Sequence, residues 1–287
     1  MKVSASFLLF LSIHLSANES TIPKNNLILD LDAEQGVTHD SQQRVTSWQS
    51  QALTTPRIIF QKQDKGRKEP HSGCPSFRKD ATSNKKPSIV FRQQELVCAE
   101  EDFFDGLVTG DGYTWIAVIA VHPQRVGVKD VNSFFGNLRN GGKYEGIWGC
   151  LNDDNSIWIG SRNGKSFGRF DANNPQVLGP VLEPGKFHII AGKMEAGKDQ
   201  VKISLYVNSS HASQEGVFPV NPHANSSKMA IGQERDAVEH PGHESFDGEI
   251  ARFLLWKGAL APQEWQEAFT NIAKQYEVLS EKNTSKK

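Results

Sequence analysis

The stretch "FDGEIARFLLWKGALAPQEWQEAFTNIAKQY", residues 246–276, begins as a strand and ends as a helix. Apolar and polar residues alternate well enough up to Trp256 for a strand. Beyond Pro262, large apolar residues follow at spacings of four, three and four, which predicts one face of an amphipathic helix: Trp265, Phe269, Ile272 and Tyr276. Such a helix can cover a sandwich of sheets, where each large side chain that it buries contributes about 1.5–3 kcal/mol.

The rest of the chain consists of short β-type runs separated by turn signals. The most apolar run, "GYTWIAVIAVHP" at 112–123, predicts a central strand that is buried on both faces and stopped by Pro123. "GIWGCLNDDNSIWIGSRNG" at 146–164 predicts a hairpin with arms at 147–151 and 156–160. Roughly a dozen such strands without interleaved helices predict an all-β fold, an antiparallel β-sandwich with a short C-terminal helix.

Composition limits the size and the partners of the protein. The chain has 287 residues and a formal net charge of -1, so no overall field attracts nucleic acid or an anionic membrane. We expect one domain over residues 25–279, long enough for a sizeable core. The polar residues 280–287 predict a disordered tail.

The N-terminal residues 1–17 are typical of a secretory signal peptide. Lys2 precedes a short apolar run at 7–15, and Ala17 offers a cleavage point. The run is too short to cross a bilayer, and no later segment is apolar enough to do so. We therefore expect a secreted or periplasmic protein.

Export would place the three cysteines in an oxidising compartment, where an odd number leaves at least one thiol unpaired. Cys98 and Cys150 fall in strand-like runs, whereas Cys74 falls in a polar stretch at 55–87 that reads as a surface loop. A bridge from Cys74 to either partner stays open. No Cys-x-x-Cys spacing predicts a zinc site.

Several stretches together resemble the laminin G-like (LamG) jelly roll of the concanavalin A-like lectin/glucanase superfamily. They are "LILDLDAEQGVTHDSQQRVTSWQSQ" (27–51), "KPSIVFRQQELVC" (86–98), the central run, and "AIGQERD" (230–236) before the closing segment. The sequence departs from the family pattern at Arg92-Gln93-Gln94, where many relatives have a Gly-Asp type turn. The resemblance implies a concanavalin A-like jelly roll in an extracellular, carbohydrate-related setting. It does not choose between lectins, hydrolases, lyases and accessory modules, which share the scaffold.

Catalysis on such a scaffold needs side chains that the sequence does not present as a motif. A retaining glycosidase needs two carboxylates about 5–5.5 Å apart, but the strand signature Glu-x-Asp-x-x-Glu is absent. The acidic run that follows residue 98 predicts a solvated loop: Glu100, Glu101, Asp102 and Asp105. A polysaccharide lyase needs a base and a cation, for which the candidates are Tyr113, His122, His188, Arg162 and Arg235.

A sugar-binding site needs an aromatic ring against the apolar face of the sugar and polar groups for its hydroxyls. The hairpin at 146–164 fits best, because two tryptophans flank its polar turn. Arg235, from the later stretch at 230–236, joins the residues of the hairpin in this hypothesis. The expected ligand-binding residues are Trp148, Asn152, Asp153, Asp154, Trp158, Arg162 and Arg235. The alternative that stays open is that both indoles lie in the core and the turn is an ordinary hairpin turn.

Two weaker metal hypotheses accompany this site. Asp153 and Asp154 could join a Ca²⁺ site, since Ca²⁺ takes hard oxygen ligands, although no EF-hand spacing is present. His240 and His243 could bind a metal, but Pro241 and Gly242 between them give a loop rather than a rigid helical pair. No other cofactor is predicted.

The sequence thus predicts a carbohydrate-binding or adhesion-type accessory module with a polysaccharide or glycan ligand. A lyase or glycoside hydrolase on the same scaffold is the first alternative, and a protein-interaction module is the second.

Overall fold

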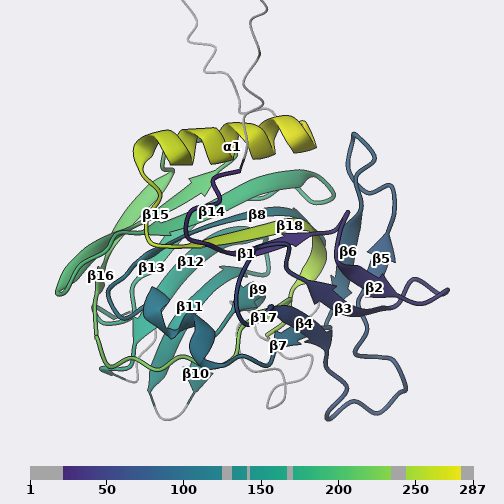
Figure 1. Ribbon diagram of the computed structural model, residues 1–287, viewed down its shortest axis with the longest axis horizontal. Coiled ribbons are helices and arrows are strands. Elements are labelled where there is room, and N and C mark those ends of the chain that lie inside the picture. Colours follow the sequence, from purple (N-terminus) through teal and green to yellow (C-terminus); the bar gives the residue numbers. More distant parts are fainter. Residues whose placement is uncertain (1–21, 125–130, 141–142, 167–170, 234–243, 279–287) are drawn as a thin grey trace, which may run out of the picture.

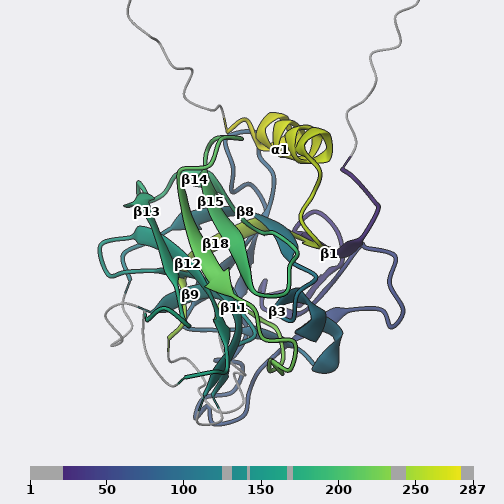
Figure 2. The ribbon, with the colours of Figure 1, turned by 90° about the vertical axis from the view of Figure 1, so that its left-hand side faces the viewer.

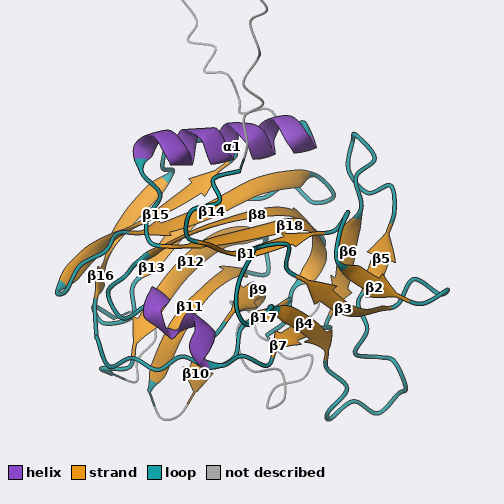
Figure 3. Ribbon diagram, viewed as in Figure 1, coloured by secondary structure: helices purple, strands orange, loops and turns teal. Residues whose placement is uncertain are grey.

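Two antiparallel sheets packed face to face form the body of the protein in this computed structural model, and a C-terminal helix lies on the outer face of one of them (Figure 1). The structure describes residues 22–124, 131–140, 143–166, 171–233 and 244–278. The predicted signal peptide and tail, and the candidates Arg235, His240 and His243, lie outside these residues. The predicted all-β sandwich with a short C-terminal helix is confirmed (Figure 3).

The first sheet has eight strands among the described residues and carries the predicted central strand. Its order is β16 (Gln214–Pro219), β15 (Gln200–Val207), β14 (Phe187–Met194), β8 (Tyr113–Val121), β18 (Asp247–Lys257), β6 (Ser88–Arg92) and β5 (Ser76–Arg78), with β1 (Leu27–Asp32) also paired to β18. Every residue of β8 is buried, as predicted. The reason is that Trp115 and Ile119 face the second sheet, whereas Ile116 and Val118 face the helix.

The second sheet has ten strands in the described part of the chain and contains the predicted hairpin. Its order is β13 (Gln176–Val181), β12 (Ser156–Asn163), β11 (Tyr144–Leu151), β9 (Asn132–Gly136), β17 (Ala230–Ile231), β7 (Leu96–Cys98), β4 (Ile59–Lys62), β3 (Val45–Gln49) and β2 (Val37–His39), with β10 (Arg139–Asn140) paired to β11. Strands β11 and β12 confirm the hairpin and extend beyond its predicted arms.

The interpretation of residues 55–87 as a surface loop is wrong in part. Strands β4 and β5 lie in this stretch, and each joins a different sheet. Phe60 is fully buried between the exposed Ile59 and Gln61. An alternation this short, surrounded by lysine and proline, is not distinguishable from a loop in the sequence alone.

Helix α1 (Pro262–Tyr276) covers the outer face of the eight-stranded sheet (Figure 2). Pro262 begins it, and the Glu264 carboxylate accepts a hydrogen bond from the Ala261 N–H. Its predicted apolar face is buried, against residues of β8, β14 and β18: Trp265, Phe269, Ile272 and Tyr276. The helix is therefore a packing element, as predicted.

A buried ion cluster ties the two ends of the domain together beneath this helix. Arg252 on β18 lies 2.8 Å from Asp30 Oδ1 and 2.7 Å from Asp32 Oδ2, both on β1. Its Nη1 also donates to Gln275 Oε1 of α1 at 3.2 Å. Burial raises the pKa of Asp32 although the guanidinium lowers it. Removing one partner of such a cluster leaves buried charge uncompensated.

None of the three cysteines forms a disulfide within the described residues, and all three are buried. The bridge considered for Cys74 is not formed, and Cys74 is covered rather than exposed in a loop. Burial raises the pKa of the Cys74 and Cys98 thiols, which makes them poor nucleophiles. No helix in the described ranges has the length and apolarity needed to cross a bilayer.

We expect Arg252→Met to lower the free energy of unfolding by about 3–5 kcal/mol, because two buried carboxylates lose their cation. Urea unfolding at neutral pH measures this. Lys257→Met on the same strand is the control, since its ion pair with Asp111 is exposed and should change stability by about 1 kcal/mol or less. Equal, small effects of the two substitutions would contradict the role given to the cluster.

Candidate functional site

The predicted tryptophans and arginine lie together on the outer face of the ten-stranded sheet. The Trp148 and Trp158 rings meet edge to face, with centroids 5.5 Å apart. Gly160 leaves room for the first ring, because a Cβ there would lie 2.5 Å from Trp148 Cζ2. The Arg162 guanidinium stacks 4.2 Å from the Tyr144 ring centroid and 4.9 Å from that of Trp148.

These side chains are packed rather than presented to solvent. Trp148 and Trp158 are each 1% exposed and Arg162 is 4% exposed. They form a small cluster with Val131 and Leu138, separate from the core between the sheets. The indoles are thus packed within the protein rather than open to solvent, and their part in ligand binding stays a prediction.

The side chains of the polar hairpin turn are hydrogen-bonded within the turn and to Asn132 of β9. Asp154 Oδ1 accepts hydrogen bonds from the Ser156 N–H at 2.8 Å and hydroxyl at 2.6 Å, which lowers the pKa of Asp154. Asn152 Nδ2 donates to the same hydroxyl, and Asn132 Nδ2 donates to Asp153 Oδ1. Within the described residues, no three acidic, histidine or cysteine side chains are grouped so that they could hold a metal ion.

The candidate acid–base residues do not converge on one point. Tyr113 lies at the start of β8, where its hydroxyl meets Ser161 Oγ at 2.9 Å and burial raises its pKa. His122 lies beyond the opposite end of β8, with Nε2 3.1 Å from the buried Glu249 carboxylate, which also pairs with Arg78. The two side chains are therefore separated by the length of a strand.

The acidic run after β7 differs from the solvated loop that was expected. Residues Asp102–Leu107 form a short 3₁₀ helix. Burial, with the nearby Asp102 and Glu101 carboxylates, raises the pKa of Asp105 to about 6. Asp105 is thus a partly buried carboxylate near Arg139.

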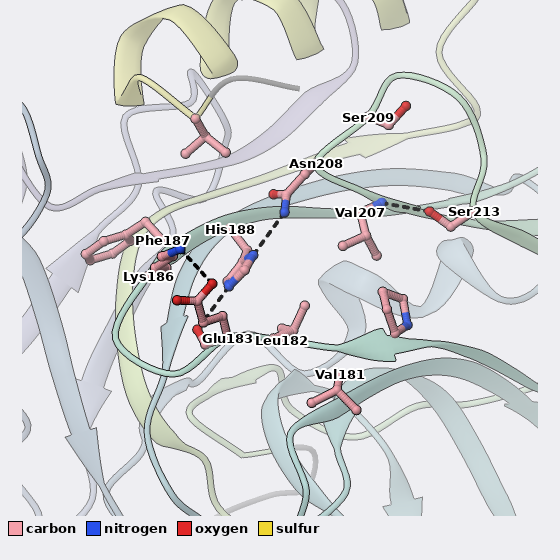
Figure 4. Close-up of a pocket in the computed structure, with 12 residues that line it drawn as sticks. Val181, Leu182, Glu183, Lys186, Phe187, His188, Val207, Asn208, Ser209 and Ser213 are labelled. Carbon is pink, nitrogen blue, oxygen red and sulfur yellow. Dashed lines mark hydrogen bonds and ion pairs between the residues drawn. The ribbon is translucent and has the colours of Figure 1, made fainter. Parts of the chain in front are cut away.

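A groove of about 730 Å³ opens between β13, an edge strand of the ten-stranded sheet, and the ends of β14 and β15 in the eight-stranded sheet (Figure 4). Its walls come from three segments: the end of β13 with the loop after it, the start of β14, and the end of β15 with the loop after it. Val278, beyond the end of α1, also lines it. The volume lies within the range of about 300–1,000 Å³ that is typical of ligand sites.

A chain of hydrogen bonds centred on His188 crosses this groove (Figure 4). His188 Nε2 lies 3.1 Å from the Glu183 carbonyl, which can only accept, so this nitrogen carries the proton. Asn208 Oδ1 accepts from the Ile189 N–H, which leaves Asn208 Nδ2 to donate to His188 Nδ1 at 2.9 Å. The imidazole is therefore neutral, and burial lowers its pKa.

Other groove residues supply both polar and apolar surface. The side chains of Glu183 and Lys186 form an ion pair at 2.6 Å and are mostly exposed. The hydroxyls of Ser209 and Ser213 each accept one backbone N–H and retain an O–H to donate. Val181 is 60% exposed at the rim. Such a surface can contact both the apolar face and the hydroxyls of a sugar.

The predicted turn adjoins this groove. The Leu182 N–H donates to the Asn155 carbonyl at 3.0 Å, and Val181 pairs with Ser156. The sequence named His188 as a candidate and the turn as a site, but it did not indicate the groove. Its lining residues are distant in the chain, and each segment alone is an ordinary strand end.

Comparison with known proteins identifies the scaffold. A family model described as "Concanavalin A-like lectin/glucanases superfamily" matches residues 103–265, more than half of the chain. No curated protein matches the sequence.

Three solved structures that resemble the chain are one binding domain and two sialidases. The binding domain of Paraclostridial Mosquitocidal Protein 1 is 12% identical, with a TM-score of 0.55, and the match covers 87% of this chain and 53% of that one. A Trypanosoma rangeli sialidase in complex with sialic acid is 11% identical, with a TM-score of 0.52, over 91% of this chain and 35% of that one. A NanB sialidase mutant from Streptococcus pneumoniae is 14% identical, with a TM-score of 0.45, and the match covers 62% of this chain and 26% of that one. At such identities the likeness to the first two shows the fold alone, and this chain spans only part of each of the three proteins.

We expect the protein to lose stability as the pH falls, in part through His188. The pKa of His188 is lower in the folded protein than its ordinary value of 6.5. The stability that the neutral ring contributes is therefore complete above pH 6.5 and is lost as the pH falls through the pKa of the folded state. Thermal unfolding is measured at about pH 7.5 and about pH 5. The decrease in Tm between the two pH values should be roughly 2–4 °C smaller in His188→Gln than in the wild type. His223→Gln, at an exposed histidine, should behave as the wild type. An unchanged pH dependence in His188→Gln would contradict a buried neutral imidazole.

Proposed function

The chain belongs to the concanavalin A-like lectin/glucanase superfamily, and from this premise we propose that it is a carbohydrate-binding accessory module with a glycan ligand. The proposal includes export, for which the support is the signal-like sequence of residues 1–17. The observation that carries the proposal is the groove between β13 and the ends of β14 and β15, whose size and mixed lining suit part of an oligosaccharide.

Binding in this groove would combine apolar contact with hydrogen bonds to hydroxyls. Val181 and the half-buried Phe187 offer apolar surface. Glu183, Lys186 and the hydroxyl of Ser213 offer acceptors and donors at the rim. The backbone that carries these groups is held by the ends of β13, β14 and β15, so the groove lining is brought together before a ligand binds.

A binding role fits this groove better than catalysis. Glu183 supplies the one carboxylate among the described residues that line it, whereas glycoside hydrolysis uses two. Both nitrogens of His188 are engaged in hydrogen bonds, so the ring is not poised to abstract a proton. The other base candidates, Tyr113 and His122, lie apart from each other.

The residues predicted from the sequence take secondary positions in this proposal. The turn that holds Asn152, Asp153 and Asp154 adjoins the groove and could contact a longer glycan. Trp148, Trp158 and Arg162 would stiffen the β11–β12 hairpin, with which β13 pairs. The outer face around these indoles is the alternative location for the ligand.

A glycan array combined with a groove variant tests the proposal. We expect the wild type to bind at least one glycan and Glu183→Ala/Lys186→Ala to bind it about tenfold or more weakly, since hydrogen bonds to charged groups contribute about 1.5–3 kcal/mol. Asp111→Ala/Lys257→Ala removes a similar exposed ion pair at the opposite end of β8 and should bind as the wild type.

Two further readouts separate the alternatives. If the outer face binds the ligand, Trp158→Phe should abolish binding while the groove variant retains it. If the protein is an enzyme, incubation with the bound polymer should produce new reducing ends or the absorbance of an unsaturated uronate product. A stable partner protein without any glycan binding would instead support an interaction module.

A further inference from the structure

We propose that the groove selects uncharged glycans over glycans that carry uronate, sialate or sulfate groups. This inference rests on the proposed function and adds the chemical class of the ligand. It follows from the interactions of the two residues in the lining that could carry a positive charge, Lys186 and His188.

The first compensated charge is that of Lys186. Its Nζ lies 2.6 Å from Glu183 Oε2, three residues earlier in the chain, and both side chains are more than half exposed at the rim. The pair carries no net charge, so it adds no long-range attraction for an anion. Both groups can still exchange hydrogen bonds with neutral hydroxyls, because each has further donors or acceptors beyond the ion pair.

The second compensated group is His188, the other cation candidate of the groove. Its Nε2–H donates to the Glu183 carbonyl, and its Nδ1 accepts from the amide of Asn208. A proton on Nδ1 would set two donors against each other. The amide cannot flip without loss, because its oxygen already binds the Ile189 N–H. The geometry therefore holds the ring neutral.

The remaining described residues of the lining add no charge. They comprise aliphatic and aromatic side chains, one amide and the hydroxyls of Ser209 and Ser213. Each of these hydroxyls accepts a backbone N–H and can donate its own hydrogen outward. Donors of this kind match hydroxyl oxygens of a neutral sugar.

An acidic sugar would place a second anion beside the Lys186–Glu183 ion pair. A ligand carboxylate that binds a further Nζ donor of Lys186 would lie close to the Glu183 carboxylate, which is already paired with that lysine. Like charges at such a distance repel each other, and burial by the ligand strengthens the repulsion. The groove therefore disfavours acidic ligands although it contains a lysine, because the Glu183 carboxylate lies beside that lysine.

The test measures binding of the full chain to neutral β-glucan and mannan oligomers, oligogalacturonate, sialyllactose and heparin fragments. We expect the wild type to bind a neutral glycan, with affinity changing about twofold or less between about 0.05 M and about 1 M NaCl. Glu183→Gln frees Lys186 and should increase binding of an acidic glycan about tenfold at low salt. Asp111→Asn frees Lys257 outside the groove and should bring no such gain.

The outcomes distinguish this inference from the proposed function. Salt-sensitive binding of acidic glycans alone by the wild type would overturn the inference and leave a glycan-binding module. Equal gains in Glu183→Gln and Asp111→Asn would overturn it as well, because the effect would then come from net charge. Binding of no glycan at all would overturn the proposed function itself.

Discussion

The ion cluster of Arg252 with Asp30 and Asp32 is the constraint on which the rest of the structure depends. It joins the last strand to the end of the helix and to the first strand, which lies more than two hundred residues earlier in the chain. Buried charges of this kind contribute little net stability, but they are costly to leave unpaired. The cluster therefore disfavours other registers of β1 on β18, and with them other positions of the helix.

The position of the helix matters for the groove. Helix α1 is held on β8, β14 and β18 by its apolar face, and Val278 just beyond it forms part of the groove wall. The opposite wall comes from β13 of the other sheet. The groove thus lies where the two sheets meet the end of helix α1. Its shape is set by the packing of the whole sandwich rather than by one loop. Sites at such junctions are typical of binding pockets.

Local patterns in the sequence predicted the elements well. The helix face around Trp265 and Phe269 and the doubly buried strand β8 follow from periodicity over a single segment. Strands β4 and β5 were missed because each shows at most one buried side chain among polar neighbours. Periodicity also assigns a residue to a face of a strand without saying whether that face is covered.

Because periodicity does not show whether a strand face is covered, the sequence could not show that the two candidate tryptophans are buried. Trp148 and Trp158 alternate correctly on the face opposite the main core, yet both are buried there. The groove could not be predicted at all, because His188, Asn208 and Glu183 come together only through the pairing of β14 with β15 and the return of the β13 loop. The family resemblance supplied the scaffold and the carbohydrate setting, but the position of the groove follows from long-range packing.

The most direct test of the central claim is to map the ligand on the protein in solution. In an NMR titration with a neutral oligosaccharide that the protein binds, we expect shifts of the Asn208 side-chain amide and of the Lys186 and Ser213 backbone amides. The indole N–H signals of Trp148 and Trp158 should stay in place. Shifts of those indoles without any change at the three groove residues would contradict the account.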